Sequence, residues 1–178
     1  NHTFFFRENK HCEYIIETMS NSSSLKIWSA ACSSGEEPYS IAIQLMENSI
    51  NFNLYATDLS DTMLQIGQKA IYSKDRVKNV PAHILRKYFQ KGLNQWTDAG
   101  RVKKIIREGV KFGKHNLVTD PPFEMFDIIF CRNVMIYFDN KTKQIVVDNL
   151  YKSLNPGGYF FVGMSESLGG INHNFKHV

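Results

Sequence analysis

Short apolar runs alternate with longer amphipathic segments along most of the chain. The apolar runs predict strands, and the third of them is almost continuously apolar, which is typical of a strand covered on both faces. The predicted strands lie at residues 26–31, 52–57, 126–131 and 159–163. The predicted helices lie at residues 36–48, 61–70, 81–89 and 140–154. Strands that alternate with helices predict right-handed βαβ units around a mainly parallel sheet, with ligands bound at the carboxyl ends of the strands.

One segment breaks this alternation. The apolar residues of 101–114 surround Glu108 and Gly109, and this arrangement predicts a β-hairpin with its turn at that pair. The same segment belongs to a basic block, because residues 86–115 hold nine Lys or Arg against two Asp or Glu, a net +7. The whole chain carries +4, so the remainder carries −3. Such a block is usually a solvated face, but its concentration here also fits an acidic partner.

The composition is that of an ordinary globular protein with one domain. The 178 residues are 43% hydrophobic and 21% charged. No apolar run approaches the roughly 18 residues that a membrane span needs, and the start of the chain lacks a signal-peptide pattern. The sequence begins without methionine, inside an apparent motif, so we expect a domain of a longer protein. Three cysteines without CxxC spacing favour a reducing cytoplasm and no metal site.

The turn after the first strand holds candidate chemistry. Ala31, Gly35 and their neighbours are small, so a ligand can approach the backbone closely. A pyrophosphate site would use several glycines, whereas this turn has one, followed by Glu36 and Glu37. Acidic residues in a first helical turn can simply complement the helix dipole. They would also suit a ligand that has no phosphate and carries a positive group.

Polar residues also follow the later strands. Asp58 ends the second strand, where an acidic residue can accept hydrogen bonds from ribose hydroxyls, although a helix-capping role is the alternative. Asn116 and Leu117 would suit the edge and face of an adenine, but asparagine is also common in ordinary loops. Arg132 and Asn133 follow the strand at 126–131, and a purely structural core leaves these two polar residues unexplained.

The first residues of the chain are the last candidates. Asn1, Thr3 and Arg7 flank a cluster of three phenylalanines. The aromatic side chains can pack on the domain while the polar groups close over a site. An arm that packs for stability alone explains this stretch equally well.

Taken together, these stretches resemble the CheR family of chemotaxis receptor methyltransferases. The matching pieces occur in order over nearly the whole chain, and they are NHTFFFRE, IWSAACSSGEEPYSIA, ATDLS, KYF, HNL, FDIIFCRNVMIYF and LNPGGYFFVGMSE. The resemblance implies a Rossmann-like, class I S-adenosylmethionine-dependent methyltransferase fold over residues 1–178, with a small antiparallel β-subdomain inserted at about 90–115. It also implies that the family's helical N-terminal domain and last strand are absent from this chain.

The resemblance further implies a reaction. S-adenosylmethionine would be the methyl donor, and glutamate side chains in the cytoplasmic domains of chemoreceptors would be the acceptors. The enzyme would act in the cytoplasm at membrane receptor arrays, with Arg7 and Tyr137 orienting the reacting groups. The positions that match the family's cofactor-binding residues are Asn1, Thr3, Arg7, Ala31, Glu36, Asp58, Asn116, Leu117, Asn133 and Val134. We expect no metal, no nucleic acid and no membrane insertion.

One departure from the family concerns docking. Members that bind a pentapeptide at the receptor's C-terminus carry a Gly-X-Gly loop where this chain reads Lys91-Gly92-Leu93-Asn94, so we expect docking without that tether.

Two alternatives stay open. The first is an S-adenosylmethionine enzyme for a small molecule or nucleic acid, which the basic block favours. The sequence DPPF at residues 120–123 does not support this alternative. In DNA amino-methyltransferases such a motif follows the apolar strand, whereas here DPPF precedes the strand at 126–131. The second is a non-catalytic signalling module that binds S-adenosylmethionine, which would need neither Arg7 nor Tyr137.

Overall fold

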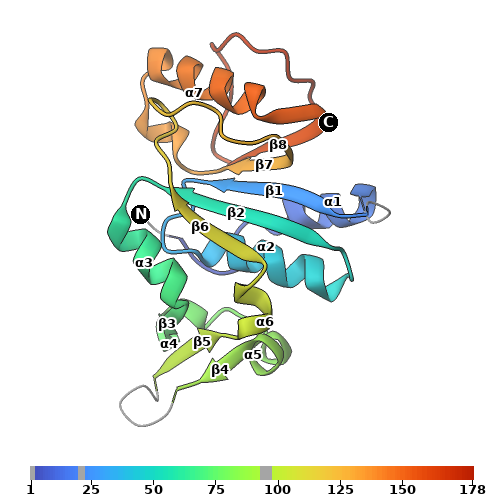
Figure 1. Cartoon of the computed structure of the whole chain (residues 1–178), viewed down its shortest axis with the longest axis vertical. Coiled ribbons are helices and arrows are strands. Elements are labelled where there is room, and N and C mark those ends of the chain that lie inside the picture. Colours follow the sequence, from blue (N-terminus) through green and yellow to red (C-terminus); the bar gives the residue numbers. More distant parts are fainter. Residues whose placement is uncertain (1–2, 20–22, 93–97) are drawn as a thin grey trace.

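The computed structural model describes residues 3–19, 23–92 and 98–178 of the chain. A central sheet of five parallel strands has the order β6-β2-β1-β7-β8 (Figure 1). The strands are β1 (Leu25–Ala30), β2 (Phe52–Asp58), β6 (Val110–Lys114), β7 (Phe126–Cys131) and β8 (Leu154–Val162). The strand order reverses between β1 and β7, and the carboxyl ends at such a point border the ligand crevice of doubly wound folds.

Helices cover both faces of this sheet. On one face lie α1 (Lys10–Met19), α2 (Glu36–Glu47) and α3 (Asp61–Lys69), and on the other lies α7 (Asn140–Lys152) (Figure 1). Alternate side chains of β1 enter the two cores, because successive residues of a strand point to opposite faces. Leu25 and Ile27 join the core under α2, whereas Trp28 and Ala30 join the core under α7. The predicted parallel α/β sheet is therefore confirmed.

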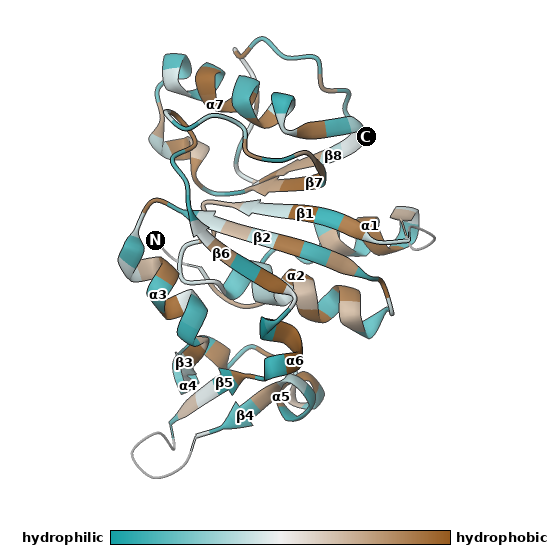
Figure 2. Cartoon of the chain, viewed as in Figure 1, coloured by the Kyte–Doolittle hydropathy of each residue, from teal (hydrophilic) through white to brown (hydrophobic). Residues whose placement is uncertain are grey.

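The starts of two helices follow the local sequence. The Ser60 hydroxyl accepts the Met63 N–H and caps α3, and Asp139 caps α7 by accepting the Thr142 N–H at 2.8 Å. Hydrophobic and hydrophilic positions alternate along α7 (Figure 2), and its apolar side faces the core. Capping and amphipathicity together make this segment a helix that packs on β7 and β8.

A second, antiparallel sheet lies below the central one in Figure 1, with the order β3-β5-β4. Its strands are β3 (Ile71–Ser73), β4 (Phe89–Lys91) and β5 (Ala99–Val102), and the short helices α4 (Lys74–Val77), α5 (Ala82–Tyr88) and α6 (Lys104–Arg107) flank it. The small sheet therefore begins well before residue 90 and ends before residue 115.

The predicted hairpin over residues 101–114 is wrong. The two strands of that segment lie in different sheets, with β5 in the small sheet and β6 beside β2 in the central sheet. Helix α6 separates them and buries Ile106 in the core. At Gly109 a Cβ atom would lie 2.8 Å from the Phe52 ring, so this glycine lets the chain turn close to β2.

The last strand also differs from its predicted bounds. It begins at Leu154, so the turn-forming residues 155–158 lie inside β8. The pairing register of β7 with β8 shifts between Phe126 and Ile128, and Gly157 has a φ of +80°. An irregularity of this kind accommodates extra residues in one strand, which is why a sequence that normally ends a helix is compatible with a strand here.

An N-terminal arm precedes α1. Phe5 is buried, and its ring packs edge-on against Tyr72 and Phe89 of the small sheet, with ring centres 4.9 and 5.3 Å apart. Helix α1, which the apolar pattern did not predict, then packs on α2 through Cys12 and Ile15. No helix within the described ranges is both long and apolar enough to cross a membrane.

Candidate active site

A cavity of about 700 Å³ lies at the carboxyl edge of the central sheet. The segments after β1, β2, β6 and β7 form its walls together with the N-terminal arm, and its volume is typical of a small-molecule site. The predicted site residues that line it are Thr3, Arg7, Ala31, Asp58, Asn116, Leu117, Asn133, Val134 and Tyr137. Asn1 lies outside the described residues, and Glu36 does not line the cavity.

The turn after β1 forms the floor of the cavity. Ala31, Ser33 and Gly35 have positive φ angles of 59°, 50° and 92°, so the chain folds back tightly between strand and helix. The N–H of Cys32 donates to the Thr57 carbonyl at 2.8 Å and holds the turn against β2. The Cys32 thiol is 2% exposed, and burial raises its pKa well above the usual range, so it is an unreactive wall residue.

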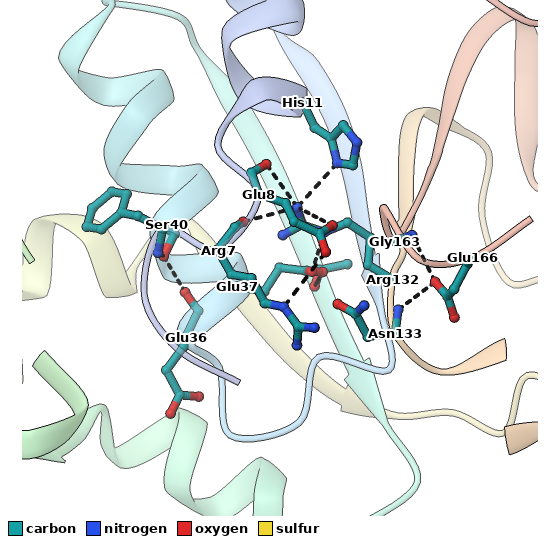
Figure 3. A network of polar contacts seen from close by, with 12 residues as sticks. Arg7, Glu8, His11, Glu36, Glu37, Ser40, Arg132, Asn133, Gly163 and Glu166 are labelled. Carbon is teal, nitrogen blue, oxygen red and sulfur yellow. Dashed lines mark hydrogen bonds and ion pairs between the residues drawn. The ribbon is translucent and has the colours of Figure 1, made fainter. Parts of the chain in front are cut away.

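Of the two adjacent glutamates after the turn, Glu37 and not Glu36 faces the cavity. Glu36 is fully buried below the turn, where Ser34 donates to its carboxylate at 2.7 Å and Arg76 forms an ion pair with it. Its side chain points away from the polar network around Arg132 (Figure 3). Glu37 lines the cavity instead, because neighbouring residues of a helix point in directions about 100° apart. The sequence prediction that Glu36 lines the site is therefore wrong.

Asp58 braces the turn from the neighbouring strand. Its carboxylate accepts the Ser33 N–H at 2.8 Å and the Ser60 N–H at 2.9 Å. An ionised carboxylate has about four lone-pair sites, so two remain for hydroxyl groups of a ligand. Both readings of Asp58, as a local structural residue and as a ligand acceptor, are therefore compatible with its geometry.

The loop after β6 is held by its own side chains. The Asn116 N–H donates to Asp120 at 2.8 Å, and the Val118 N–H donates to the Asn116 side-chain oxygen at 3.0 Å. The Asn116 N–H also lowers the pKa of Asp120. Leu117 is 7% exposed and lines the cavity. Asp120 thus shapes the loop that leads into β7.

The loop after β7 forms the opposite wall. Asn133 has a φ of 59°, and a short 3₁₀ helix at Met135–Tyr137 follows it. Glu166, after β8, accepts backbone N–H groups of this loop (Figure 3). The loop presents Asn133 to the interior of the cavity, while Tyr137 is 65% exposed at its rim.

Arg132 ties the arm to the cavity floor. Its Nε donates to Glu37 at 2.8 Å, and its Nη1 donates to the carbonyls of Arg7 and Glu8, both at 3.2 Å (Figure 3). The Arg132 side chain is only 5% exposed. Burial lowers its pKa, but the surrounding acidic groups, chiefly the charge and hydrogen bond of Glu37, together raise it above its ordinary value. The buried cation therefore fixes both the Glu37 carboxylate and the path of the arm.

The cavity is thus lined by two carboxylates, those of Glu37 and Asp58. Comparison with known proteins identifies the family. The model of the "CheR methyltransferase, SAM binding domain" matches residues 1–178. The chain belongs to the CheR methyltransferase family. Among the described residues no group of three or more His, Cys, Asp or Glu side chains is arranged to hold a metal ion.

Relatives of the CheR family extend over the whole chain. A chemotaxis protein methyltransferase of Borreliella burgdorferi is 41% identical over 100% of this chain and 68% of its own length. That of Escherichia coli K12 is 35% identical over 98% of this chain and 64% of its own. The chain thus spans about two thirds of the length of these relatives. The glycopeptide N-methyltransferase MtfA, solved with sinefungin, has a TM-score of 0.53 at 12% identity, covers 90% of this chain and 50% of its own, and shares the fold.

The cavity has the chemistry that a CheR cofactor requires. S-adenosylmethionine carries a sulfonium and an ammonium cation, ribose hydroxyls and an adenine, and it has no phosphate. The cavity offers the Glu37 carboxylate to a cation, the free lone pairs of Asp58 to hydroxyls, and apolar side chains such as Leu117 and Val134 to a flat base. The residues present therefore fit the cofactor of the family.

Sequence reasoning missed two carboxylates of this CheR site. Glu37 was considered only together with Glu36 and was not among the predicted cofactor residues, and Glu166 was one letter of a matching motif without a role. No signal in the sequence distinguishes Glu37 from Glu36, since the choice depends on the left-handed turn at Gly35. Glu166 follows β8 and reaches the loop after β7 only because these strands are neighbours in the sheet.

Proposed function

We propose that this chain is the catalytic domain of a protein-glutamate O-methyltransferase that modifies chemoreceptor cytoplasmic domains with S-adenosylmethionine. The observation that carries the proposal is one cavity that is lined by the carboxylates of Glu37 and Asp58 and also by Arg7 and Tyr137. The names of the relatives, which are chemotaxis protein methyltransferases, support the choice of receptors as substrates. The products would be glutamate methyl ester and S-adenosylhomocysteine, at receptor arrays on the cytoplasmic face of the membrane.

In this proposal the cofactor contacts follow the cavity walls. Glu37 takes the amino group of the methionine portion, in place of Glu36 as the acidic residue of the cofactor site, while Arg132 holds the Glu37 carboxylate in place. Asp58 accepts the ribose hydroxyls. Asn116, Leu117, Asn133 and Val134 contact the adenine and methionine portions. Thr3 and Arg7 close the cavity from the arm, and Ala31 leaves room beside the turn.

The reaction needs no general base. When bound, S-adenosylmethionine supplies a methyl group on a positively charged sulfur. A glutamate side chain has an unperturbed pKa of about 4.3, so the acceptor is already a carboxylate at neutral pH. One of its oxygens forms the new O–CH₃ bond as the S–CH₃ bond breaks, and neutral S-adenosylhomocysteine leaves with the electron pair. No proton is transferred, so the protein contributes mainly by positioning and by excluding water.

Arg7 and Tyr137 would position the acceptor. Arg7 has a side chain that is 32% exposed, and its guanidinium lies 5.7 Å from the centre of the Phe4 ring. A guanidinium at the rim can bind the second oxygen of the acceptor carboxylate. The Tyr137 hydroxyl can donate to the same group. The two side chains thus provide a cation and a donor for a carboxylate, which a neutral or cationic acceptor would not use.

A second part of the proposal concerns the surface that docks on the receptor. The basic side chains between residues 86 and 115 would face acidic receptor helices, and we propose docking without a pentapeptide tether. In the loop that differs from the family's Gly-X-Gly sequence, Lys91 lies in β4 and Gly92 follows it. Leu93 and Asn94 lie outside the described residues.

The natural full-length protein with labelled S-adenosylmethionine tests the proposal. Receptor cytoplasmic domains and nucleic acid are offered as separate acceptors, and the label is then treated with mild base. We expect label on the receptor domain that base releases as methanol. Label on nucleic acid alone would favour an S-adenosylmethionine enzyme that modifies nucleic acid. Binding of S-adenosylhomocysteine without any methyl transfer would favour a non-catalytic signalling module. Either result would overturn the proposal.

A further inference from the structure

The carboxylate of Glu166 accepts four backbone hydrogen bonds. Its Oε2 accepts the N–H of Asn133 at 2.6 Å and of Gly163 at 2.8 Å (Figure 3). Its Oε1 accepts the N–H of Met135 at 2.8 Å and of Ile136 at 3.3 Å. Because a carboxylate has about four lone-pair sites, these contacts use its full capacity. Glu166 therefore serves the protein backbone, and it is not itself a ligand-binding group.

The four donors come from two segments that meet at the carboxyl edge of the sheet. Three of them belong to the loop after β7, and Gly163 directly follows β8. The side chain thus joins the ends of two neighbouring strands. Glu166 and Asn133 are half-buried and Met135 and Gly163 are buried, and in such surroundings hydrogen bonds to a charged group are stronger than in water. Only the Ile136 donor is exposed.

The loop that Glu166 holds is a wall of the cavity. Asn133, Ile136 and Tyr137 all line it. Asn133 has a φ of 59°, a conformation that a side chain other than glycine adopts at a cost. An acceptor for the Asn133 N–H therefore offsets the strain at the residue that presents its side chain to the cavity.

Gly163 lets the carboxylate approach. A Cβ at this position would lie 2.6 Å from the Asn133 side-chain nitrogen and 2.8 Å from Glu166 Oε2. Real Cβ atoms do not approach polar atoms so closely, so a larger residue would displace the side chains of Asn133 and Glu166. The glycine and the glutamate are parts of the same arrangement.

We propose that Glu166 is a positioning residue of the methyltransferase, which sets the cofactor-side geometry of residues 133–137 through their backbone N–H groups. Its effect on cofactor affinity, through Asn133, does not depend on the identity of the acceptor. Its effect on the acceptor, through Tyr137, rests on the proposed function. Loss of the carboxylate lets the loop relax and moves Asn133 away from the cofactor. It also moves Tyr137 away from the acceptor.

Calorimetry with S-adenosylhomocysteine on the natural full-length protein tests the cofactor part. Glu166→Gln places an amide N–H₂ against two N–H donors, and we expect the dissociation constant to rise about 10- to 100-fold, as for residues that orient the ligands of metal sites. The matched control is Asp127→Asn at the other end of β7. Asp127 also accepts a backbone N–H, from Lys26 at 2.8 Å, but it is remote from the cavity. Its amide variant should bind with unchanged affinity.

Gly163→Ala provides a second, independent variant, because it keeps the carboxylate and displaces it. We expect weakened binding here too, together with faster amide hydrogen exchange at Asn133 and Met135. Should Glu166→Gln fail to fold, Gly163→Ala decides the question. A lower melting temperature with unchanged affinity in the folded variants would mean a merely structural role and would overturn the inference.

The kinetic test separates this inference from the proposed function. With a receptor acceptor, Glu166→Gln should raise KM for S-adenosylmethionine and lower kcat, because both Asn133 and Tyr137 move. Wild-type protein that binds S-adenosylhomocysteine but methylates no receptor would contradict the proposed function, while the calorimetric difference between the variants would still stand.

Discussion

Two adjacent glutamates lie in different surroundings although only one residue step separates them. Glu36 is fully buried and paired with Arg76, whereas Glu37 lines the cavity and is held by Arg132 and by the Ser29 hydroxyl at 2.7 Å. The Glu36 pair lies between the turn after β1 and helix α4 of the small-sheet region. Its role is therefore to join the cavity floor to the rest of the molecule.

This division predicts opposite effects of two matched substitutions. Glu37→Gln should weaken binding of S-adenosylhomocysteine about tenfold or more, because a charged contact is lost. Glu36→Gln should leave that affinity nearly unchanged and lower the free energy of unfolding by about 1–2 kcal/mol, since Arg76 stays partly solvated. Calorimetry and denaturant unfolding of both variants provide the measurement. The reverse pattern would restore the assignment of Glu36 to the cofactor.

At the rim, Tyr137 is expected to act on the acceptor and not on the cofactor. Tyr137→Phe should lower kcat with the receptor substrate on the order of 10- to 100-fold, because a misplaced acceptor reacts slowly. The affinity for S-adenosylhomocysteine should stay the same. Tyr151→Phe on α7 is the control, since Tyr151 is also exposed but packs on Phe175, away from the cavity. Equal kcat values for the two variants would remove Tyr137 from the mechanism.

His115 makes a residue-level contribution to pH dependence. Its side chain is 9% exposed beside the rings of Trp28 and Phe123, and burial lowers its pKa although Asp120 opposes this. In the unfolded chain the imidazole takes up a proton near pH 6.5, but in the folded protein it does so only at lower pH. Its contribution to the free energy of unfolding is thus present above about pH 6.5 and is lost as the pH falls through the lowered pKa.

The corresponding prediction compares a variant with the wild-type protein. His115→Gln should reduce the loss of stability on acidification below about pH 6.5, by comparison with the wild-type protein. Denaturant unfolding of both proteins at a series of pH values provides the measurement. His11, whose pKa burial and Arg132 also lower, is unchanged in both proteins and cancels from the comparison. Parallel curves for wild type and His115→Gln would refute the assignment.

Among the elements, the turn between β1 and α2 combines a left-handed glycine with close packing. Gly35 has a φ of +92°, and a Cβ there would lie 3.0 Å from the Tyr72 hydroxyl and 3.1 Å from the Gly67 backbone. The Tyr72 hydroxyl also donates to the Ser34 carbonyl at 2.7 Å. The small sheet therefore supports the floor of the cavity through β3.

Gly35→Ala should destabilise the fold for these reasons. We expect a loss of about 1–3 kcal/mol in the free energy of unfolding from the left-handed conformation, with the close contacts adding to it. Gly113→Ala on β6 is the matched control, because its added Cβ would meet nothing within 4 Å. Equal stability of the two variants in urea would contradict this account of the turn.

The elements that sequence analysis located well are those with a long pattern. β1, β2 and β7 could be predicted because each is a run of six or seven mostly apolar residues, and α7 could be predicted from its amphipathic period. The small sheet could not, because its strands have three or four residues, too few to establish a period. Its pairing of Ile71 with Arg101 also joins positions far apart in the chain.

In the whole molecule, the candidate site collects short polar segments from across the sequence. The positions of Asp58, Asn116 and Asn133 could be predicted because each follows a strand of a parallel sheet, whose carboxyl ends share one edge. The link from Arg132 to the carbonyls of Arg7 and Glu8 could not, because it depends on how the arm folds over that edge. The family resemblance supplied the cofactor, and the structure shows that Glu37, and not Glu36, lines the cavity.

The most direct test of the central claim is site-resolved mass spectrometry of a receptor cytoplasmic domain. The domain is incubated with S-adenosylmethionine and the natural full-length protein, digested, and mapped before and after mild base. The account predicts methyl groups on specific glutamate side chains, all removed by base and all missing when those glutamates are replaced by alanine. Base-stable methylation of lysine or arginine, or an unmodified receptor in the presence of bound cofactor, would contradict it.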